Sequence, residues 1–570
     1  MLLQPYNEMN IYKRVEDRHA RAVKVRHDFD KPREQIVEYF RPDLTDVVDN
    51  KGRLFESTNV YNGDPAYAGR VMTQGVFAGM CNPAQPWRRF KLPEKELSDD
   101  NDTRAWLQQL DRIMLDTYAD RESTFYRALA RYFHSKFTVG SPVMVIEKHP
   151  TESRIVYTSP HHNQYWLIRD YFGEIVGLHI VYKMPAIEVY DTFAGSEHLF
   201  PMTLKHAMQS GSHWAEWEIL QSFYRVKDRI FRDRPKTDVE IMQHRPWVCM
   251  WQLRHTDQDK EEPLQIRYYR SRPFVVGDWD LNPNEAYSRT PAWHAMIDVK
   301  SEQRAFRSQI QLAELKARPP IWALARLAAK INRMPGQTTY VGEDEFQYAP
   351  QPFGHEGDFI TAERMWDRLG ESCRRWFFVG YFLQLTQMVA NKQAPPTATQ
   401  IIDMDAEKLT QLSGGIQGIE TEDLWPIDDR VFEIRYAEGD IPQPPDVYLY
   451  EGSGELIPQF EGSLSQAQRL NTMLSRVRTG IEMTGPLYGL DEMAIHKVKV
   501  PELVEHILEE VGIWQDTIRD RREYEDIVAG ILEDRARQQA MLEGKAQAET
   551  VKALSGKTDR TSPLAQMVKQ

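Results

Sequence analysis

The sequence has 570 residues and a mass of 66.6 kDa, which predicts several domains or one subunit built from several parts. Hydrophobic residues make up 41% and charged residues 27% of the chain, a balance typical of a protein that buries a real core. The formal net charge is −13, whereas a free-standing nucleic-acid-binding protein usually carries a basic surface. We therefore expect any contact with DNA to be loose.

The sequence also disfavours a membrane protein and a secreted protein. No run of eighteen apolar residues occurs, so no membrane span is expected. The first residues turn polar at once and lack the apolar core of a signal peptide. The three cysteines, Cys81, Cys249 and Cys373, are odd in number and far apart. This spacing argues against a disulfide framework and favours synthesis in a reducing cytosol.

The first 289 residues predict a mixture of helices and strands. A charged segment with few breakers predicts a helix over 8–40, and an Ala-, Val- and Met-rich segment predicts another that stops at Asn82. One or two further helices are expected over 102–136. Strands should follow, with a hairpin turn at about 170–173, and β-type runs continue over 216–280.

A long helix is predicted from Thr290, a hydroxyl N-cap followed by proline, to about Arg318. Apolar residues recur along it every three or four positions and form one stripe. We expect the charged residues, Glu302 among them, to occupy the other faces. The stripe consists of Ala292, Met296, Val299, Phe306, Ile310 and Ala313, and the other faces carry Asp298, Lys300, Glu302, Arg304, Arg307, Glu314 and Lys316.

A short mixed module follows the Pro319-Pro320 pair that ends this helix. It combines an apolar run, a Pro-Gly turn, the short strand TTYV and two patches of opposite charge. The basic patch is Arg326, Lys330 and Arg333, and the acidic patch is Glu343, Asp344 and Glu345.

A second long helix is predicted over 358–383. Its apolar positions repeat at alternating three- and four-residue spacing and include Trp366, Leu369 and Trp376, so one continuous stripe should pack against a neighbour. The loop 384–396 carries a single charge, Lys392.

A third helix should begin at Thr397, with Gln400 completing a capping box. Gly414, Gly415 and Gly418 interrupt this helix. Because a glycine costs about 1 kcal/mol in a helix interior, we expect a kink or a close backbone contact there.

The motifs that suggest enzyme chemistry are weak. The segment SGKT at 555–558 resembles the end of a phosphate-binding loop, but Val551 stands where the motif needs glycine. The adjacent His161 and His162 would face opposite sides of a strand, and the acidic run 98–102 is better explained as a helix cap. We therefore predict no catalytic residues, no metal and no cofactor.

Four segments, in this order, resemble blocks of the portal proteins of short-tailed bacteriophages, the head-to-tail connector family. They are GMCNPAQPWRRFKL at 79–92, the segment 268–320 around AYSRTPAW, PPTATQIIDMDAEKLTQL at 395–412, and EGSLSQAQRL at 461–470. The sequence departs from the family pattern at Ser288 (usually Gly), Thr290 (usually Ser) and Gln400 (usually Glu). The first two replacements are small residues, so the turn before the helix should survive.

The resemblance implies an α+β portal fold, with long stem helices, a β-rich wing and a small clip, assembled as a ring of twelve subunits. The implied parts are the wing at 1–289 and 397–515, the latter with the kinked helix, the stem at 290–318 and 358–383, the clip at 319–357, the tunnel loop at 384–396 and the crown at 516–570.

The resemblance also implies a place at one capsid vertex of the virion, after assembly in the host cytoplasm. Double-stranded DNA would pass through the central channel without sequence specificity, and the ring would meet the terminase large subunit, tail adaptor proteins, and the major capsid and scaffolding proteins. The implied channel residues are Gln387, Asn391, Lys392 and Gln393, the implied clip contacts are Arg326, Lys330, Arg333, Glu343, Asp344 and Glu345, and the implied stem packing residues are Trp366, Leu369 and Trp376.

Two other classes remain as alternatives. A virion or scaffold protein without a DNA channel would form no closed ring. A nuclease or ATPase of the packaging machine would need a complete phosphate loop or a carboxylate cluster, and neither is visible in the sequence. The loop 384–396 also has a simpler reading, as a surface loop between packed helices.

Overall fold

The computed structural model describes residues 11–44, 60–93, 100–150, 152–225, 246–254, 263–318, 320–322, 359–383, 411–451, 455–466, 469 and 521–555, together with 325, 338, 340, 343–347 and 351–352. The chain divides into two compact units, Met1–Asn471 and Thr472–Gln570. All sheets and all helices but one among the described residues belong to the first unit.

The helices predicted near the N-terminus are confirmed. They are α2 (Ile11–Phe40), α3 (Asp64–Met80), α5 (Asn101–Ala119) and α6 (Phe125–Phe137). Asp100 caps α5, because its carboxylate accepts a hydrogen bond from Thr103 N at 3.0 Å. The acidic run before α5 therefore supplies a helix cap, as the sequence indicates.

A five-stranded antiparallel sheet follows these helices, in the order β4-β5-β6-β7-β8. Val15 of α2 packs against one face, and strands of a three-stranded sheet, β3-β2-β9, pack against the other. The five strands are β4 (Tyr165–Arg169), β5 (Ile175–Pro185), β6 (Glu216–Arg225), β7 (Trp247–Leu253) and β8 (Gln265–Tyr269), and the three are β2 (Val143–Lys148), β3 (Ile155–Thr158) and β9 (Phe274–Val276).

The β4–β5 hairpin turns where the sequence predicts. The Asp170 carboxylate accepts hydrogen bonds from the backbone N–H groups of Phe172 and Glu174, and Gly173 adopts a φ of +85°, which favours glycine. Between β5 and β6 the chain forms short helices to which the sequence analysis assigns no element. They are α7 (Ala186–Thr192), the 3-10 helix η1 (Ala194–Leu199) and α8 (Met202–Gln209).

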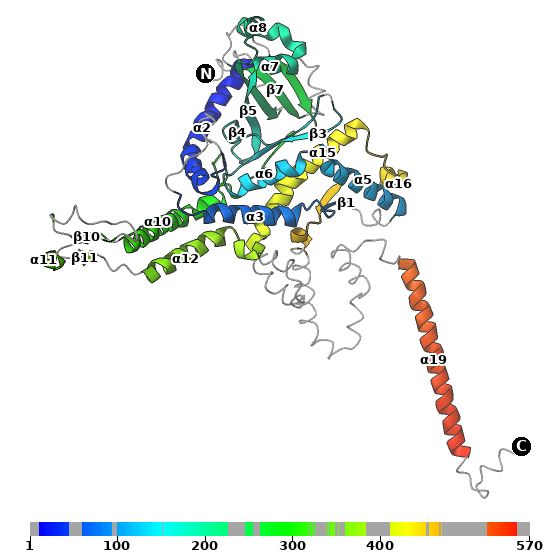
Figure 1. Ribbon diagram of the computed structural model, residues 1–570. Helices are drawn as coiled ribbons and strands as arrows, with labels where there is room; N and C mark the ends of the chain where they lie inside the picture. The colour runs from blue at the N-terminus through cyan, green and yellow to red at the C-terminus, as the bar shows by residue number, and fades with distance from the viewer. Residues whose placement is uncertain are drawn as a thin grey trace, which may run out of the picture. The chain divides into compact units, whose positions relative to one another are not determined.

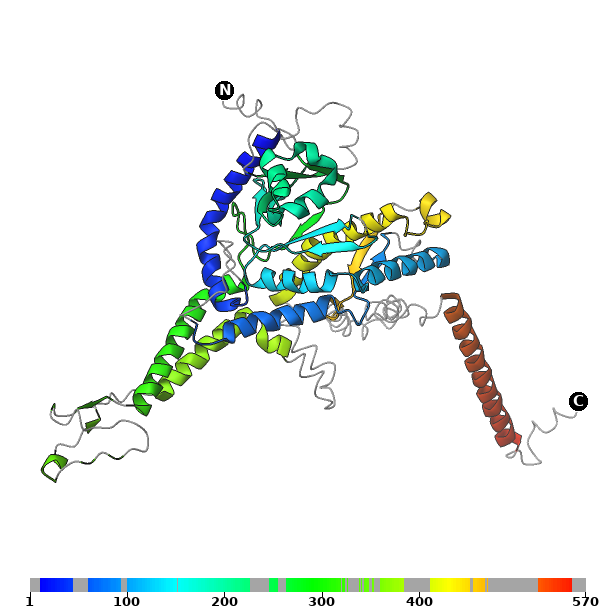
Figure 2. The same ribbon diagram turned by 45° about the horizontal axis from the view of Figure 1, so that its top comes forward.

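Two long helices form an arm that extends from the rest of the first unit (Figure 1). They are α10 (Pro291–Ala317) and α12 (Phe359–Trp376), which lie side by side in both views (Figure 2). Beyond them lie α11 (Glu343–Phe346) and the antiparallel pair β10 (Ile321–Trp322) and β11 (Gln351–Pro352).

The predicted second arm helix is too long at its C-terminal end. The helix α12 ends at Trp376, and Phe378 has a φ of +50° before a further helical turn at 379–383. Phe377 and Phe382 are buried in the main core. At Gly75 of α3 a Cβ atom would lie 2.1 Å from the Phe382 ring. The chain therefore leaves the helical path where these aromatic rings enter the core.

The helix at 411–438 contains the irregularity predicted from its glycines. Ordinary helix at 411–418 leads into the π-helix η4 (Ile419–Leu424) and then into α15 (Trp425–Glu438). A Cβ atom at Gly415 would lie 2.5 Å from the Trp279 ring, so the expected close contact is present. The chain continues through α16 (Asp446–Glu451) to β12 (Ile457–Phe460), which pairs with β1 (Arg88–Lys91).

In the second unit the described residues form one helix, α19 (Arg521–Ser555). Its described side chains are almost all exposed, which agrees with the predicted solvated helix. Across the part of the chain that the structure describes, we find no helix with the length and apolar character that a membrane span requires.

Candidate functional site

The start of α10 is attached by hydrogen bonds to the turn after α6. The Thr290 hydroxyl accepts a hydrogen bond from Trp293 N at 3.1 Å and donates to the carbonyl of Thr138 at 2.7 Å. Thr290 is fully buried. One side chain therefore caps α10, as predicted, and also attaches the helix to the turn after α6.

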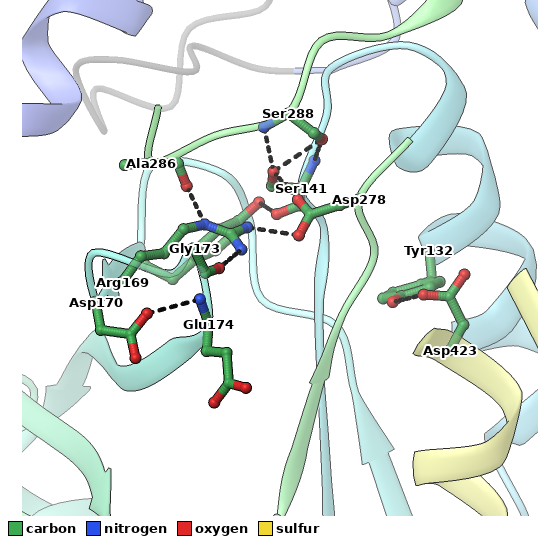
Figure 3. Close-up of polar contacts among 11 residues, drawn as sticks. Tyr132, Ser141, Arg169, Asp170, Gly173, Glu174, Asp278, Ala286, Ser288 and Asp423 are labelled. Carbon is green, nitrogen blue, oxygen red and sulfur yellow. Dashed lines mark hydrogen bonds and ion pairs between the residues drawn. The ribbon is translucent and has the colours of Figure 1, made fainter. Parts of the chain in front are cut away.

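Ser288 takes a role that the sequence analysis missed. Its backbone N–H donates to the Ser141 hydroxyl at 2.8 Å, and the two hydroxyl oxygens are 3.0 Å apart (Figure 3). Ser141 has a φ of +42°, and a Cβ atom on the preceding Gly140 would lie 2.7 Å from the Ser288 carbonyl oxygen. The Ser288 side chain and backbone therefore hold this tight turn.

Arg169 connects the same region to the β4–β5 hairpin. Its guanidinium donates to the carbonyls of Ala286 at 2.8 Å and Gly173 at 2.9 Å, and it pairs with Asp278 at 2.6 Å (Figure 3). Asp278 also accepts a hydrogen bond from the Ser141 hydroxyl at 2.7 Å. Charge-assisted bonds of this kind are stronger than neutral ones, so the start of α10 is fixed firmly to the sheets.

A second group of contacts, which we call the root cluster, joins the arm to the start of α3. It consists of Asn62, Asp64, Glu302, Gln303 and Arg374. Gln303 accepts from the backbone N–H groups of Tyr61 (2.7 Å) and Asn62 and donates to the Asn62 carbonyl (3.0 Å). Arg374 of α12 pairs with Asp64 at 2.6 Å. Both arm helices are therefore attached to one short segment.

The prediction that Glu302 lies on an outward face is wrong. Its side chain is fully buried, and its Oε1 atom accepts from Asn62 Nδ2 at 3.0 Å. Its Oε2 atom has no hydrogen-bond partner among the described residues. Burial, together with the Asp64 carboxylate, raises the pKa of Glu302 to about 7. The charge pattern of α10 could not reveal this, because the partner Asn62 comes from far away in the sequence.

The predicted stem packing residues have different environments. Trp366 and Leu369 are half-buried, and the Trp366 ring lies 5.5 Å from that of Phe306 on α10. Trp376 is 44% exposed. It stacks on His294 at 5.4 Å and donates a hydrogen bond to Asp298. The predicted apolar stripe of α12 thus packs against α10 at Trp366. Trp376 lies at the edge of the contact between the two helices and is partly exposed.

Exposed apolar side chains remain on both arm helices. Ile297 is 78% exposed, and Met365 is 58% exposed. Ile310 is also exposed at 37%, although the sequence placed it on the buried stripe. These side chains are therefore available for contact with another chain.

The other predicted site residues are only partly described. Glu343 and Asp344 are exposed on α11, and Glu345 belongs to the same helix. The remaining predictions lie outside the described residues: Arg326, Lys330 and Arg333 of the basic patch, and Gln387, Asn391, Lys392 and Gln393 of the loop.

Two buried ion pairs that the sequence analysis missed hold the 411–438 helix. Lys136 of α6 pairs with Asp423, which also accepts from the Tyr132 hydroxyl at 2.8 Å (Figure 3). Arg88 of β1 pairs with Asp428 at 2.8 Å. Asp423 lies within the π-helix η4, and Asp428 lies in α15 just after it. In the sequence, these buried charged residues look like ordinary surface residues. The periodicity of apolar residues alone therefore does not show that they are buried.

Comparison with known proteins agrees with this architecture. Residues 12–518 match the family model of the bacteriophage head to tail connecting protein. The chain belongs to this family.

Two relatives narrow the class further. The chain is 25% identical over 551 residues to the portal protein of Salmonella phage epsilon15, covering 92% of this chain and 93% of that protein. It is also 25% identical over 425 residues to the probable portal protein of Bordetella phage BPP-1, covering 72% and 71% respectively. The resemblance drawn from the sequence motifs is therefore confirmed, and the portal role is supported for this structural virion component.

Proposed function

We propose that this chain forms the ring at one capsid vertex through which the viral genome enters during packaging and leaves during ejection. The family match over 12–518 carries this proposal. The arm adds a physical argument, because its two helices expose apolar residues that neighbouring copies would cover. In a closed ring each copy would use two different surfaces, one toward each neighbour.

The parts of the chain then take the following roles. The arm helices α10 and α12 form the stem that surrounds the channel, and the segment between them forms the clip. The clip docks the terminase large subunit during packaging and tail adaptor proteins afterwards. Residues 1–289 and 397–515 form the wing, and 516–570 form the crown that faces the capsid interior. The ring also meets the major capsid and scaffolding proteins.

We further propose that the loop 384–396 is the tunnel loop that faces moving DNA. Its single charge, Lys392, supports this assignment. Each phosphate that a Lys or Arg neutralises adds to affinity through counterion release, so a nearly neutral loop can touch DNA without holding it. The chain's net charge of −13 also weakens the electrostatic attraction between the protein and DNA.

Native mass spectrometry of the purified chain tests the assembly. We propose twelve subunits, arranged head to tail, and expect one dominant species at twelve times the mass of the chain. The clip is expected to contribute to this contact, because its basic and acidic patches are offset along the sequence. A protein that remains a monomer or dimer at micromolar concentration would contradict the proposal and favour a virion protein without a channel.

A further inference from the structure

A basic pocket lies where the end of α2, the helices α3 and α6, and the loop 159–164 come together. It has a volume of about 820 Å³. Its lining includes Arg41, Asp43, Arg70, Arg131, His134 and His161. Three permanent positive charges and one carboxylate therefore line one concave surface.

The positive charge in the pocket is only partly compensated. Asp43 pairs with Arg41 through two hydrogen bonds of 3.1 and 3.2 Å. Arg70 and Arg131 are exposed, and neither forms an ion pair with any residue that the structure describes. Two guanidinium groups thus remain available in a chain whose overall charge is negative.

Arg41 supplies a second, independent observation. Its side chain is 7% exposed, and its Nη1 atom is buried without a hydrogen-bond partner among the described residues. A buried donor without a partner costs free energy, and the cost is larger for a charged group. Arg41 also lines the pocket, so its guanidinium adds positive charge close to any anion that binds there.

The pKa of His134 reflects the positive charge of the same surface. Burial and the neighbouring Arg41 and Arg70 lower the pKa of His134 to about 3. Its ring is therefore neutral at physiological pH. His134 therefore adds no charge of its own to the lining of the pocket.

We propose that this pocket binds a phosphate-class anion. Guanidinium groups present planar, paired donors that match the oxygen atoms of phosphate. Arg70 and Arg131, which are exposed, would donate to the anion, and the buried Arg41 would add positive charge beside it. The anion is either a backbone phosphate of DNA or a free phosphate, and both offer the same oxygen atoms.

Calorimetric titration at fixed low salt tests the proposal with two probes, inorganic phosphate and a short DNA duplex. The variants Arg70→Gln and Arg131→Gln change exposed side chains, and their melting temperatures establish that they fold. Each should weaken binding of the anion about tenfold, because a hydrogen bond to a charged group is lost. Arg112→Gln is the control, since Arg112 is an exposed arginine of α5 that does not line the pocket.

The two probes distinguish the sources of the anion. Duplex binding that is weakened by both pocket variants, and competed by inorganic phosphate, assigns the site to a DNA backbone phosphate. Phosphate binding with the same sensitivity, but without duplex binding, assigns it to a free anion. The proposal is overturned if the wild-type chain binds neither probe, or if Arg112→Gln weakens binding as much as the pocket variants do.

Discussion

The buried carboxyl group of Glu302 connects the arm to the segment before α3, where it accepts a hydrogen bond from Asn62. Between its folded pKa of about 7 and the unfolded value of about 4.3, the native protein binds more protons than the unfolded chain. Stability should therefore be highest below this window and fall as pH rises through it. The groups that face Glu302 are Asn62, Asp64, Arg374 and Cys373.

The variant Glu302→Gln tests this assignment, because it removes the ionisation and keeps the acceptor for Asn62. We expect it to raise the melting temperature at pH 8, by the equivalent of about 1 kcal/mol, and to change little at pH 5. Glu314→Gln, an exposed position on the same helix, should have no pH-dependent effect. If Glu302→Gln destabilises the protein equally at both pH values, the carboxylate is charged and paired in the native state.

The buried pair of Lys136 and Asp423 gives a second test at this scale. Both side chains are at most 1% exposed. Lys136→Met leaves a buried carboxylate whose remaining described partner is the Tyr132 hydroxyl, which typically costs about 3–5 kcal/mol. Adding Asp423→Leu should recover most of the loss, as measured by chemical denaturation. If the double variant is as unstable as the single one, the penalty does not arise from the unpaired charge.

Individual polar residues were the hardest features to predict from the sequence. Thr290 was predicted as a cap because its partner Trp293 is three residues away. The sequence did not predict the roles of three other residues, because the fold alone brings their distant partners close. These residues are Ser288, Glu302 and Asp423. A charged residue in a helical pattern usually faces solvent, so these exceptions require the tertiary structure.

At the scale of elements, the two tryptophans of α12 should behave differently. Trp366 packs against Phe306, and Trp366→Ala should cost about 2–3 kcal/mol of stability and reduce ring yield. Trp376 is 44% exposed in the single chain. Trp376→Ala should therefore lower the melting temperature of the dissociated chain less than Trp366→Ala does, by no more than its stacking on His294 and its hydrogen bond to Asp298 contribute.

If neighbouring copies cover Trp376, Trp376→Ala should still lower the yield of rings, as measured by size-exclusion chromatography. Trp425→Ala is a matched control, because Trp425 is also 44% exposed but lies on α15, outside the arm. Normal assembly of both α12 variants would show that this stripe is neither core nor interface.

The loop 384–396 gives a prediction about DNA movement. Exposed loop substitutions usually change stability by less than about 0.5 kcal/mol, so Lys392→Ala should melt and assemble normally. Lys392→Glu would place negative charge against the phosphates and should reduce the length of packaged genome more than alanine does. Full-length packaging at the normal rate with Lys392→Glu would show that Lys392 does not face the DNA. A block in assembly would instead place the loop in a subunit contact.

Helix starts and ends were predicted well where local signals exist. Proline, a hydroxyl cap and periodic apolar residues define α10, and α2 ends immediately before Arg41-Pro42. The end of α12 was missed because Phe378 adopts its positive φ while Phe377 and Phe382 are buried in the core. Such tertiary effects override local helix preference.

For the whole molecule, the order of motifs along the sequence predicted the family correctly. The α+β fold is also confirmed in its coarse form, since long helices and antiparallel sheets are both present. The proposed ring could not be derived from one chain by folding rules, because an interface between copies would appear in a single subunit only as exposed apolar residues. Ile297 and Met365 are exposed apolar residues of this kind.

We propose that copies of this chain close into a ring around a channel. The most direct measurement is a class average of negatively stained particles viewed along their axis. We predict a closed ring of twelve equal subunits with an open centre. Open filaments, single particles without rotational symmetry, or closed particles without a central channel would contradict the proposed ring.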